Sequence, residues 1–420
     1  MKGRPAPALA FMLSLCAPSA LATDWTQFRG PHGLGISEEK NLPLHWSSNE
    51  NIAWKAPLSG PGSSSPTVVH GRVYVTCYTG YGLEPNAGEQ ANLRRHLFCF
   101  DRKSGSVLWS KEFEPKLPEH AYQGEGSYQG YAPSTPISDG ERLYVFFGKS
   151  GVYCFDLNGA EKWHVSVGDG INGWGSGPSP VLFGKLLLVN ASVESGSLVA
   201  LDKLNGNEVW RAGGIGAAWD TPLLLDGKQG TEVVVSVHKR LLSFNPLDGQ
   251  PLWNAEGIDH YICPSVVAHG DVIFAIGGGH TSLAVRSGGS GDVTASQTVW
   301  RQNKGSNVSS PVYHDGYLYW ASDGGGFVCC QDAATGATVF QERLEPGPGK
   351  IWSSALLADG KLYFVSQHAG TYVVAARPKF EQLAHNVFAD DDSRANATPA
   401  VSDGQLFLRT DRNLYCIGKK

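Results

Sequence analysis

The chain has 420 residues, 41% of them apolar, which is enough to bury a large core. Lys and Arg number 34 against 39 Asp and Glu, so no basic excess supports a nucleic-acid partner. Charged residues make up only 17% while glycine occurs 52 times, a bias typical of many short strands joined by tight turns.

The N-terminus has the pattern of an export signal. Lys2 precedes a mostly apolar run over residues 8–16, and a small-x-small sequence follows at residues 20–22. The run is too short for a membrane span, which needs about 20 residues. Leu15 precedes Cys16 where a lipoprotein signal would carry a small residue. We therefore expect cleavage after residue 22 and a periplasmic or secreted product.

Eight x-Gly turns recur along the rest of the chain. After a first interval of 69 residues, their glycines lie 44, 43, 43, 46, 44 and 44 residues apart. A constant period of this size, built from strands, predicts a β-propeller. The turn glycines are Gly71, Gly140, Gly184, Gly227, Gly270, Gly316, Gly360 and Gly404.

Each repeat predicts four strands. The inner strand follows a Ser/Thr-Pro pair, the third strand ends near an aspartate that we expect to bond the next turn, and the outer strand ends in tryptophan. The expected starts of the inner strands are Ser65, Thr135, Ser179, Thr221, Cys263, Ser310, Ser354 and Thr398. The aspartates are Asp101, Asp156, Asp202 and Asp332, and the tryptophans are Trp109, Trp163, Trp210, Trp253 and Trp300.

The two chain ends complete each other. Residues 51–55 read as an outer strand without three preceding strands, and residues 414–417 as a third strand without a fourth. Pairing them removes two exposed sheet edges. The sequence thus predicts an all-β, eight-bladed propeller of four-stranded antiparallel blades over residues 23–420, as a single monomeric domain.

The cysteines do not form a disulfide framework. Seven remain after cleavage, and Cys99, Cys154, Cys330 and Cys416 share one column of the repeat with small residues. We expect free, buried thiols there. A bond between Cys329 and Cys330 stays open as an alternative, although neighbouring strand residues point to opposite faces.

The candidate binding residues lie at one end of the propeller. The two long insertions, over residues 78–95 and 113–131, fall at the same end as the residues that precede the inner strands. The predicted funnel residues are Tyr131, Trp174, Trp219, Asp220, His260, Tyr261, Asn307, Lys350, Trp352, Arg394 and Asn396.

Residues of this composition at the channel entrance are suited to binding a small molecule or a protein. Flat aromatic faces would stack on a sugar or quinone ring, and Arg394 or Lys350 could hold a carboxylate. The alternative is that the aromatic residues only fill the channel. We predict no catalytic or metal-ligating residue, because no triad spacing, HExxH or CxxC pair occurs.

The repeat resembles the pyrroloquinoline quinone (PQQ)-like propeller repeat. That family includes quinoprotein dehydrogenases and the non-enzymatic outer-membrane protein assembly factor B. Residues 24–31, DWTQFRGP, also resemble a signature of secreted bacterial members of unknown role. The resemblance covers nearly the whole mature chain and implies the fold, whereas function does not follow from a fold.

Two functions follow as expectations. The first is an exported scaffold that binds a protein or a small sugar- or quinone-like ligand at the long-loop face and funnel, without a cofactor. The alternative is a PQQ-dependent oxidoreductase acting on an alcohol or sugar. The resemblance would then imply PQQ and Ca²⁺, with Asp220 and Asn307 or Asn396 as the set that resembles the Ca²⁺ ligands.

Overall fold

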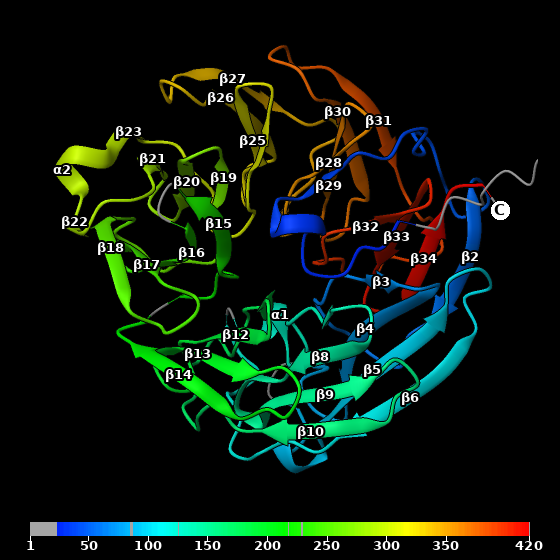
Figure 1. The fold of residues 1–420 in the computed structure, drawn as a ribbon. Helices are drawn as coiled ribbons and strands as arrows, with labels where there is room; N and C mark the ends of the chain where they lie inside the picture. The colour runs from blue at the N-terminus through cyan, green and yellow to red at the C-terminus, as the bar shows by residue number, and fades with distance from the viewer. Residues whose placement is uncertain (1–22, 85–86, 125, 217, 228–229, 420) are drawn as a thin grey trace, which may run out of the picture.

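Eight β-sheets are arranged in a ring around a central axis (Figure 1). The computed structural model describes residues 23–84, 87–124, 126–216, 218–227 and 230–419, so the expected signal peptide lies outside the described residues. The all-β eight-bladed propeller is confirmed. No helix in the described ranges is long and apolar enough to cross a membrane.

Each blade contains four antiparallel strands in chain order, except blade 8. Blade 1 comprises β3 (Thr67–Val69), β4 (Arg72–Thr79), β5 (Arg94–Asp101) and β6 (Val107–Phe113), and blade 2 comprises β7 (Ile137–Ser138), β8 (Arg142–Phe146), β9 (Val152–Asp156) and β10 (Glu161–Val165). Blade 3 comprises β11 (Val181–Phe183), β12 (Leu186–Ala191), β13 (Ser197–Asp202) and β14 (Glu208–Gly213), and blade 4 comprises β15 (Leu223–Gly227), β16 (Gly230–Val237), β17 (Arg240–Phe244) and β18 (Pro251–Glu256).

The second half of the chain continues the same order. Blade 5 comprises β19 (Val267–His269), β20 (Val272–Gly277), β21 (Thr281–Arg286) and β23 (Thr298–Gln302), and blade 6 comprises β24 (Val312–His314), β25 (Tyr317–Ala321), β26 (Phe327–Asp332) and β27 (Thr338–Arg343). Blade 7 comprises β28 (Leu356–Ala358), β29 (Lys361–Val365), β30 (Thr371–Ala375) and β31 (Gln382–Asn386), and blade 8 comprises β32 (Ala400–Ser402), β33 (Gln405–Arg409), β34 (Asn413–Ile417) and β2 (Ile52–Pro57).

Short elements lie outside this pattern. Two-residue strands add to the edges of blades 7 and 4 in parallel, namely β1 (Ile36–Ser37) beside β28 and β22 (Gly291–Asp292) beside β18. The helical turns are η1 (Pro31–Gly33), η2 (Gln90–Asn92), α1 (Gly126–Gln129), η3 (Gly148–Ser150) and α2 (Thr294–Gln297).

The columns of the repeat have the predicted roles. The aspartate that ends the third strand accepts main-chain hydrogen bonds from the following turn, as Asp101 Oδ1 does from the amides of Lys103 and Ser104 at 3.1 and 2.8 Å. The buried cysteine of that strand lies opposite the outer-strand aromatic residue, as Cys99 does opposite Trp109. A small side chain is needed there because the indole covers it.

The outer-strand tryptophans dock one blade onto the next, except Trp253, which donates from Nε1 to Glu232 of its own blade at 2.6 Å. Trp210 of blade 3 donates from Nε1 to the carbonyl of Pro246 in blade 4 at 3.0 Å. Its ring lies against Gly249 in the same turn, where a Cβ atom would stand 2.5 Å from the indole. The equivalent tryptophans of blades 1, 2 and 5 make the same pair of contacts.

The chain ends close the ring as predicted. Strand β2 pairs with β34 in antiparallel register, with Trp54 opposite Cys416 and Ala56 opposite Leu414. Arg409, fully buried in β33, crosses to blade 1 and donates to the carbonyl of Thr76 at 2.5 Å.

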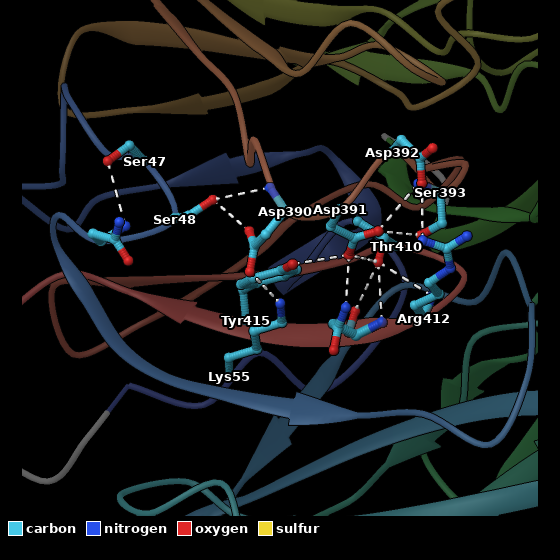
Figure 2. Close-up of polar contacts among 12 residues, drawn as sticks. Ser47, Ser48, Lys55, Asp390, Asp391, Asp392, Ser393, Thr410, Arg412 and Tyr415 are labelled. Carbon is cyan, nitrogen blue, oxygen red and sulfur yellow. Dashed lines mark hydrogen bonds and ion pairs between the residues drawn. The ribbon is translucent and has the colours of Figure 1, made fainter.

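An acidic loop between blades 7 and 8, which contains Asp390, Asp391 and Asp392, stabilises the pairing of the two chain ends (Figure 2). Lys55 Nζ of β2 contacts Asp390 Oδ2 at 2.8 Å, and Tyr415 of β34 donates from its hydroxyl to Asp391 Oδ2 at 2.8 Å. Burial opposes ionisation of Asp391, but hydrogen bonds from Ser393, Thr410, Asn413 and Tyr415 outweigh it and lower its pKa to about 2.

Two details of the predicted repeat are wrong. In blade 4, Gly227 is not a turn residue but the last residue of β15, where it pairs with Gly230, because this hairpin is longer. In blade 5, the residue equivalent to the predicted starts of the other inner strands is Ser265 rather than Cys263. Every other inner strand begins two residues after its hydroxyl residue, and β19 begins at Val267, two residues after Ser265.

None of the cysteines beyond residue 22 forms a disulfide bond, so the alternative of a Cys329–Cys330 bond is wrong. Burial raises the pKa of both thiols to about 12. Such thiols are buried small hydrophobic groups rather than nucleophiles.

Candidate functional site

The N-terminal segment plugs the channel from the Gly-turn end. Asp24 Oδ1 accepts from the amide of His70 in that turn at 2.9 Å, and Trp25 pairs with Val68 of blade 1. The chain then crosses the bore to blade 7, where the carbonyl of Gly35 accepts from the amide of Leu357 at 2.8 Å. In Figure 1 this blue segment, with its single helical turn, lies in the middle of the ring.

Arg29 anchors the plug against the far side of the bore. Its side chain is fully buried, and Nη2 donates to the carbonyls of Leu34, at 3.0 Å, and of Pro311 in blade 6. Burial lowers the pKa of Arg29 to about 9. The neighbouring Phe28 lines the channel cavity and, because the plug enters from the Gly-turn end, forms the floor of that cavity.

A belt of hydroxyl groups surrounds the channel above this floor. In blades 2 to 8, the hydroxyl of the residue two positions before the inner strand accepts from the equivalent amide of the preceding blade, at 2.9 to 3.2 Å. The belt residues are Ser65, Thr135, Ser179, Thr221, Ser265, Ser310, Ser354 and Thr398. Seven such bonds link the eight blades, and the gap lies at the closure, where the Ser65 hydroxyl has no partner among the described residues.

The belt leaves hydrogen-bond donors facing the channel. Each of the seven bonded hydroxyls accepts one amide proton, and no acceptor for its own proton is found in the described part of the chain. A hydroxyl can donate and accept at once. The belt therefore offers donors to a ligand, and all of its residues except Thr135 line the cavity above Phe28.

This cavity, the funnel, opens at the long-loop end and has a volume of about 150 Å³. Its upper wall is aromatic. The ring of Trp174 lies 5.2 Å from that of Trp219 and 4.2 Å, edge-on, from that of Tyr261. Across the mouth, Trp352 contacts Tyr128 edge-on at 4.8 Å between ring centroids.

The second long insertion covers part of the mouth. The carbonyls of Ser127 and Tyr128 in α1 accept from Arg394 Nη1 at 3.1 Å and from Asn396 Nδ2 at 2.6 Å. On the other side, Gln129 donates from Nε2 to the carbonyl of Trp174. The insertion thus bridges blade 8 and the approach to blade 3.

The structure places five of the predicted funnel residues in its wall and two at its rim. The wall residues are Trp174, Trp219, Tyr261, Trp352 and Asn396. At the rim, the ammonium of Lys350 lies 4.2 Å from the ring centroid of Tyr128, and Arg394 Nε contacts Asp411 Oδ2 at 3.3 Å. Both cations are engaged with protein groups.

Four predicted residues do not line the funnel. Tyr131 turns under the insertion and donates to the carbonyl of His120 at 2.8 Å. Asp220 is fully buried and accepts from the amide of Ser236 at 2.9 Å, and its burial raises its pKa to about 8. The side chain of His260 packs against Tyr261, and Asn307 donates to Asp323 at 2.9 Å.

The sequence did not point to Phe28, Gln129 or the belt as funnel residues. The belt could have been found, because a hydroxyl recurs before the inner strand of every blade once Ser265 replaces Cys263 in the alignment. Phe28 and Gln129 lie outside the repeat, so no column predicts them.

The funnel does not fit PQQ with Ca²⁺. PQQ carries three carboxylates, which need cationic partners, yet no Lys, Arg or His lines the funnel in the described ranges. The one set that resembles the Ca²⁺ ligands is dispersed, because Asp220 and Asn307 are committed to protein partners away from the funnel. No group of three or more His, Cys, Asp or Glu residues in the described ranges is arranged to hold a metal ion.

Comparisons with known proteins agree with the repeat. The model of the family described as outer membrane protein assembly factor BamB matches residues 44–167 and 148–379. No curated protein matched the chain.

Several solved structures share the fold. The quinohemoprotein alcohol dehydrogenase from Comamonas testosteroni is 12% identical, with a TM-score of 0.68 over 94% of this chain and 81% of that one. BamB from Moraxella catarrhalis is 12% identical, with a TM-score of 0.54 over 87% and 96% of the two chains. A europium-containing methanol dehydrogenase is 10% identical, with a TM-score of 0.63 over 94% and 98%. Because the family model matches most of the sequence, the chain belongs to this PQQ-like propeller family, whose model is described as outer membrane protein assembly factor BamB.

Proposed function

We propose that this protein is an exported binding protein whose funnel takes a small, neutral, polyhydroxylated ring such as a sugar unit. The observation that supports this is the composition of the funnel wall, in which aromatic faces stand above a hydroxyl belt without a single Lys, Arg, His, Asp or Glu among the described lining residues.

The aromatic and the polar parts of the funnel wall match the apolar face and the hydroxyl groups of a sugar ring, respectively. The faces of Trp174, Trp219 and Trp352 suit the apolar C–H face of a sugar ring. The belt hydroxyls and Asn396 suit its hydroxyl groups, because both sides can donate and accept. A carboxylated ligand would lose its hydration there without gaining a cation.

The likeness to both BamB and alcohol dehydrogenases concerns the fold alone, so it favours neither a protein-binding scaffold nor an enzyme. Export rests on the charged, apolar and small-residue pattern of residues 1–22.

The test is direct titration of the purified protein with mono- and oligosaccharides, followed by tryptophan fluorescence and calorimetry. We expect saturable binding by at least one neutral sugar, weakened about tenfold or more in Trp352→Ala. Ser179→Ala should weaken it less, because one hydrogen bond is lost.

Tyr313→Ala is the control, since this ring stacks on His269 in a different part of the propeller, outside the funnel wall, and its loss should leave the affinity unchanged. PQQ with Ca²⁺ is titrated alongside. Saturable PQQ binding with dye reduction by alcohols, and no response to sugars, would overturn the proposal in favour of an oxidoreductase.

A further inference from the structure

A second cavity lies beside the funnel, between blades 2 and 3 and beneath the second long insertion. It has a volume of about 30 Å³, enough for a group the size of one or two water molecules, and shares only Pro133 with the funnel wall. The exposed residues Ile171 and Asn172 form part of its lining, so it reaches the surface at the connection between blades 2 and 3.

The cavity gathers buried polar atoms that have no hydrogen-bond partner in the described part of the chain. They are His120 Nε2, Ser134 Oγ, Ser176 Oγ, Glu194 Oε1 and Glu194 Oε2, none of which makes a hydrogen bond of good geometry, although Ser176 lies close enough to Glu194 to act on the pKa of its carboxyl. Glu194 is only 4% exposed and His120 only 6%. Buried polar groups in folded proteins are almost always paired, so five unpaired atoms around one cavity point to an occupant.

Two glycines pack closely against these side chains. A Cβ atom on Gly148 would stand 3.1 Å from Glu194 Oε1 and 3.5 Å from Ser176 Oγ. A Cβ atom on Gly175 would stand 3.1 Å from His120 Nε2. The two glycines therefore let the main chain approach these side chains more closely than any other residue type would allow.

The charge of Glu194 has no counter-charge in the cavity. Arg95 contacts Glu119 at 2.7 Å in a buried ion pair, and Lys149 turns its ammonium to the carbonyls of Leu117 and Pro118 at 3.4 and 3.2 Å. The neighbouring charge that acts on Glu194 is the negative one of Glu119. A cation would supply the counter-charge that Glu194 lacks, whereas a water molecule would supply hydrogen bonds only.

We propose that this cavity binds a primary ammonium group. Its N–H donors match the Glu194 carboxylate and the hydroxyls of Ser134 and Ser176. Burial, reinforced by Arg95, lowers the pKa of His120 to about 4, so the ring is neutral. A metal ion fits less well, because the described residues supply no third His, Cys, Asp or Glu ligand.

The ammonium belongs either to a small free amine or to a lysine side chain. For a lysine, the exposed Ile171 lies at the opening, where it would cover the apolar stem. Methylammonium is the probe for the first source, and Nα-acetyl-lysine amide for the second.

The experiment measures binding to the full protein at about pH 8 by calorimetry and thermal unfolding. Methylammonium chloride is compared with sodium chloride at equal ionic strength. We expect saturable one-to-one binding of at least one of the two amines, weakened roughly 10- to 100-fold in Glu194→Gln, which removes a charge-assisted hydrogen bond. Glu141→Gln, the same change at an exposed position of blade 2, should leave the affinity unchanged.

Other outcomes would overturn the proposal. They are the absence of saturable amine binding, an equal response to sodium or Mn²⁺, or unchanged affinity in Glu194→Gln. Should that variant fail to fold, Ser176→Ala tests the same contact, with an expected loss of about threefold to tenfold. Sugar binding in the funnel should be unaffected by these variants, so the two proposals can fail independently.

Discussion

The indole Nε1 of Trp54 donates to the carbonyl of Arg102 at 2.8 Å, across the seam where the chain ends meet. Trp54 lies in β2, which completes blade 8, whereas Arg102 follows the third strand of blade 1. A Cβ atom on Gly105 would stand 2.5 Å from the same indole. One strand therefore both completes the last blade and docks it onto the first.

Trp54→Ala should lower the free energy of unfolding by about 3 to 5 kcal/mol, the usual cost of deleting a large buried aromatic side chain. Urea unfolding measures the loss. Trp109→Ala is the matched control, since Trp109 makes the same contact with Leu157 between blades 1 and 2. Both should lose stability, but only Trp54→Ala should be cleaved by protease within residues 51–57. Equal cleavage patterns would contradict the role of Trp54 in the closure.

Gly249→Ala should destabilise the protein more than Gly316→Ala. Both glycines have a positive φ, 72° and 87°, and so share the backbone cost of about 1 kcal/mol. A Cβ atom at Gly249 would also meet the Trp210 ring at 2.5 Å, whereas none of the described atoms lies within 4 Å at Gly316. Thermal unfolding of the two variants should give clearly separated midpoints. Equal midpoints would show that the Trp210 ring can move away from the added Cβ atom without a loss of stability.

The repeat made the fold predictable because eight equivalent hairpins demand the same residues at the same spacing. One strand start, Cys263, was assigned wrongly because the Cys-Pro pair resembles the Ser-Pro pairs of the other blades, whereas the belt needs the hydroxyl of Ser265.

The site was less predictable from the sequence than the fold. The plug depends on contacts such as that of Arg29 with Pro311, which are distant in sequence, and Tyr131 was assigned to the funnel although the insertion buries it.

Asp391→Asn should cost about 1 to 2 kcal/mol near neutral pH, because the carboxylate holds Thr410, Asn413 and Tyr415 together. The pKa of Asp391 is lowered to about 2 in the folded state. Its stabilisation is therefore complete above the unfolded pKa, near 4, and is lost as the pH falls through 2. Urea midpoints of both proteins should converge over this acidic range, and a constant gap would contradict the assignment.

Glu194 should show the opposite pH dependence. Burial raises its pKa to about 7, so the folded state binds a proton that the unfolded state, with a pKa near 4.5, has released. The wild-type protein should lose about 3 kcal/mol relative to Glu194→Gln as the pH rises from about 4.5 to 7 in amine-free buffer. Chemical unfolding at a series of pH values checks this. A flat difference would mean that the carboxylate is already paired.

Removal of residues 23–37 should open the channel without opening the ring. The deleted plug supplies acceptors for the amides of Ser138 at 2.9 Å and Leu357 at 2.8 Å, which should then exchange with solvent much faster in hydrogen-exchange mass spectrometry. Amides of β34 that pair with β2 should stay protected, because the closing strand remains. Removal of residues 23–60 deletes that strand as well and exposes the edge of β34, so this variant should oligomerise or misfold. If both deletions behave alike, the plug and the closing strand form one unit, and the floor formed by Phe28 is inseparable from the closure of the ring.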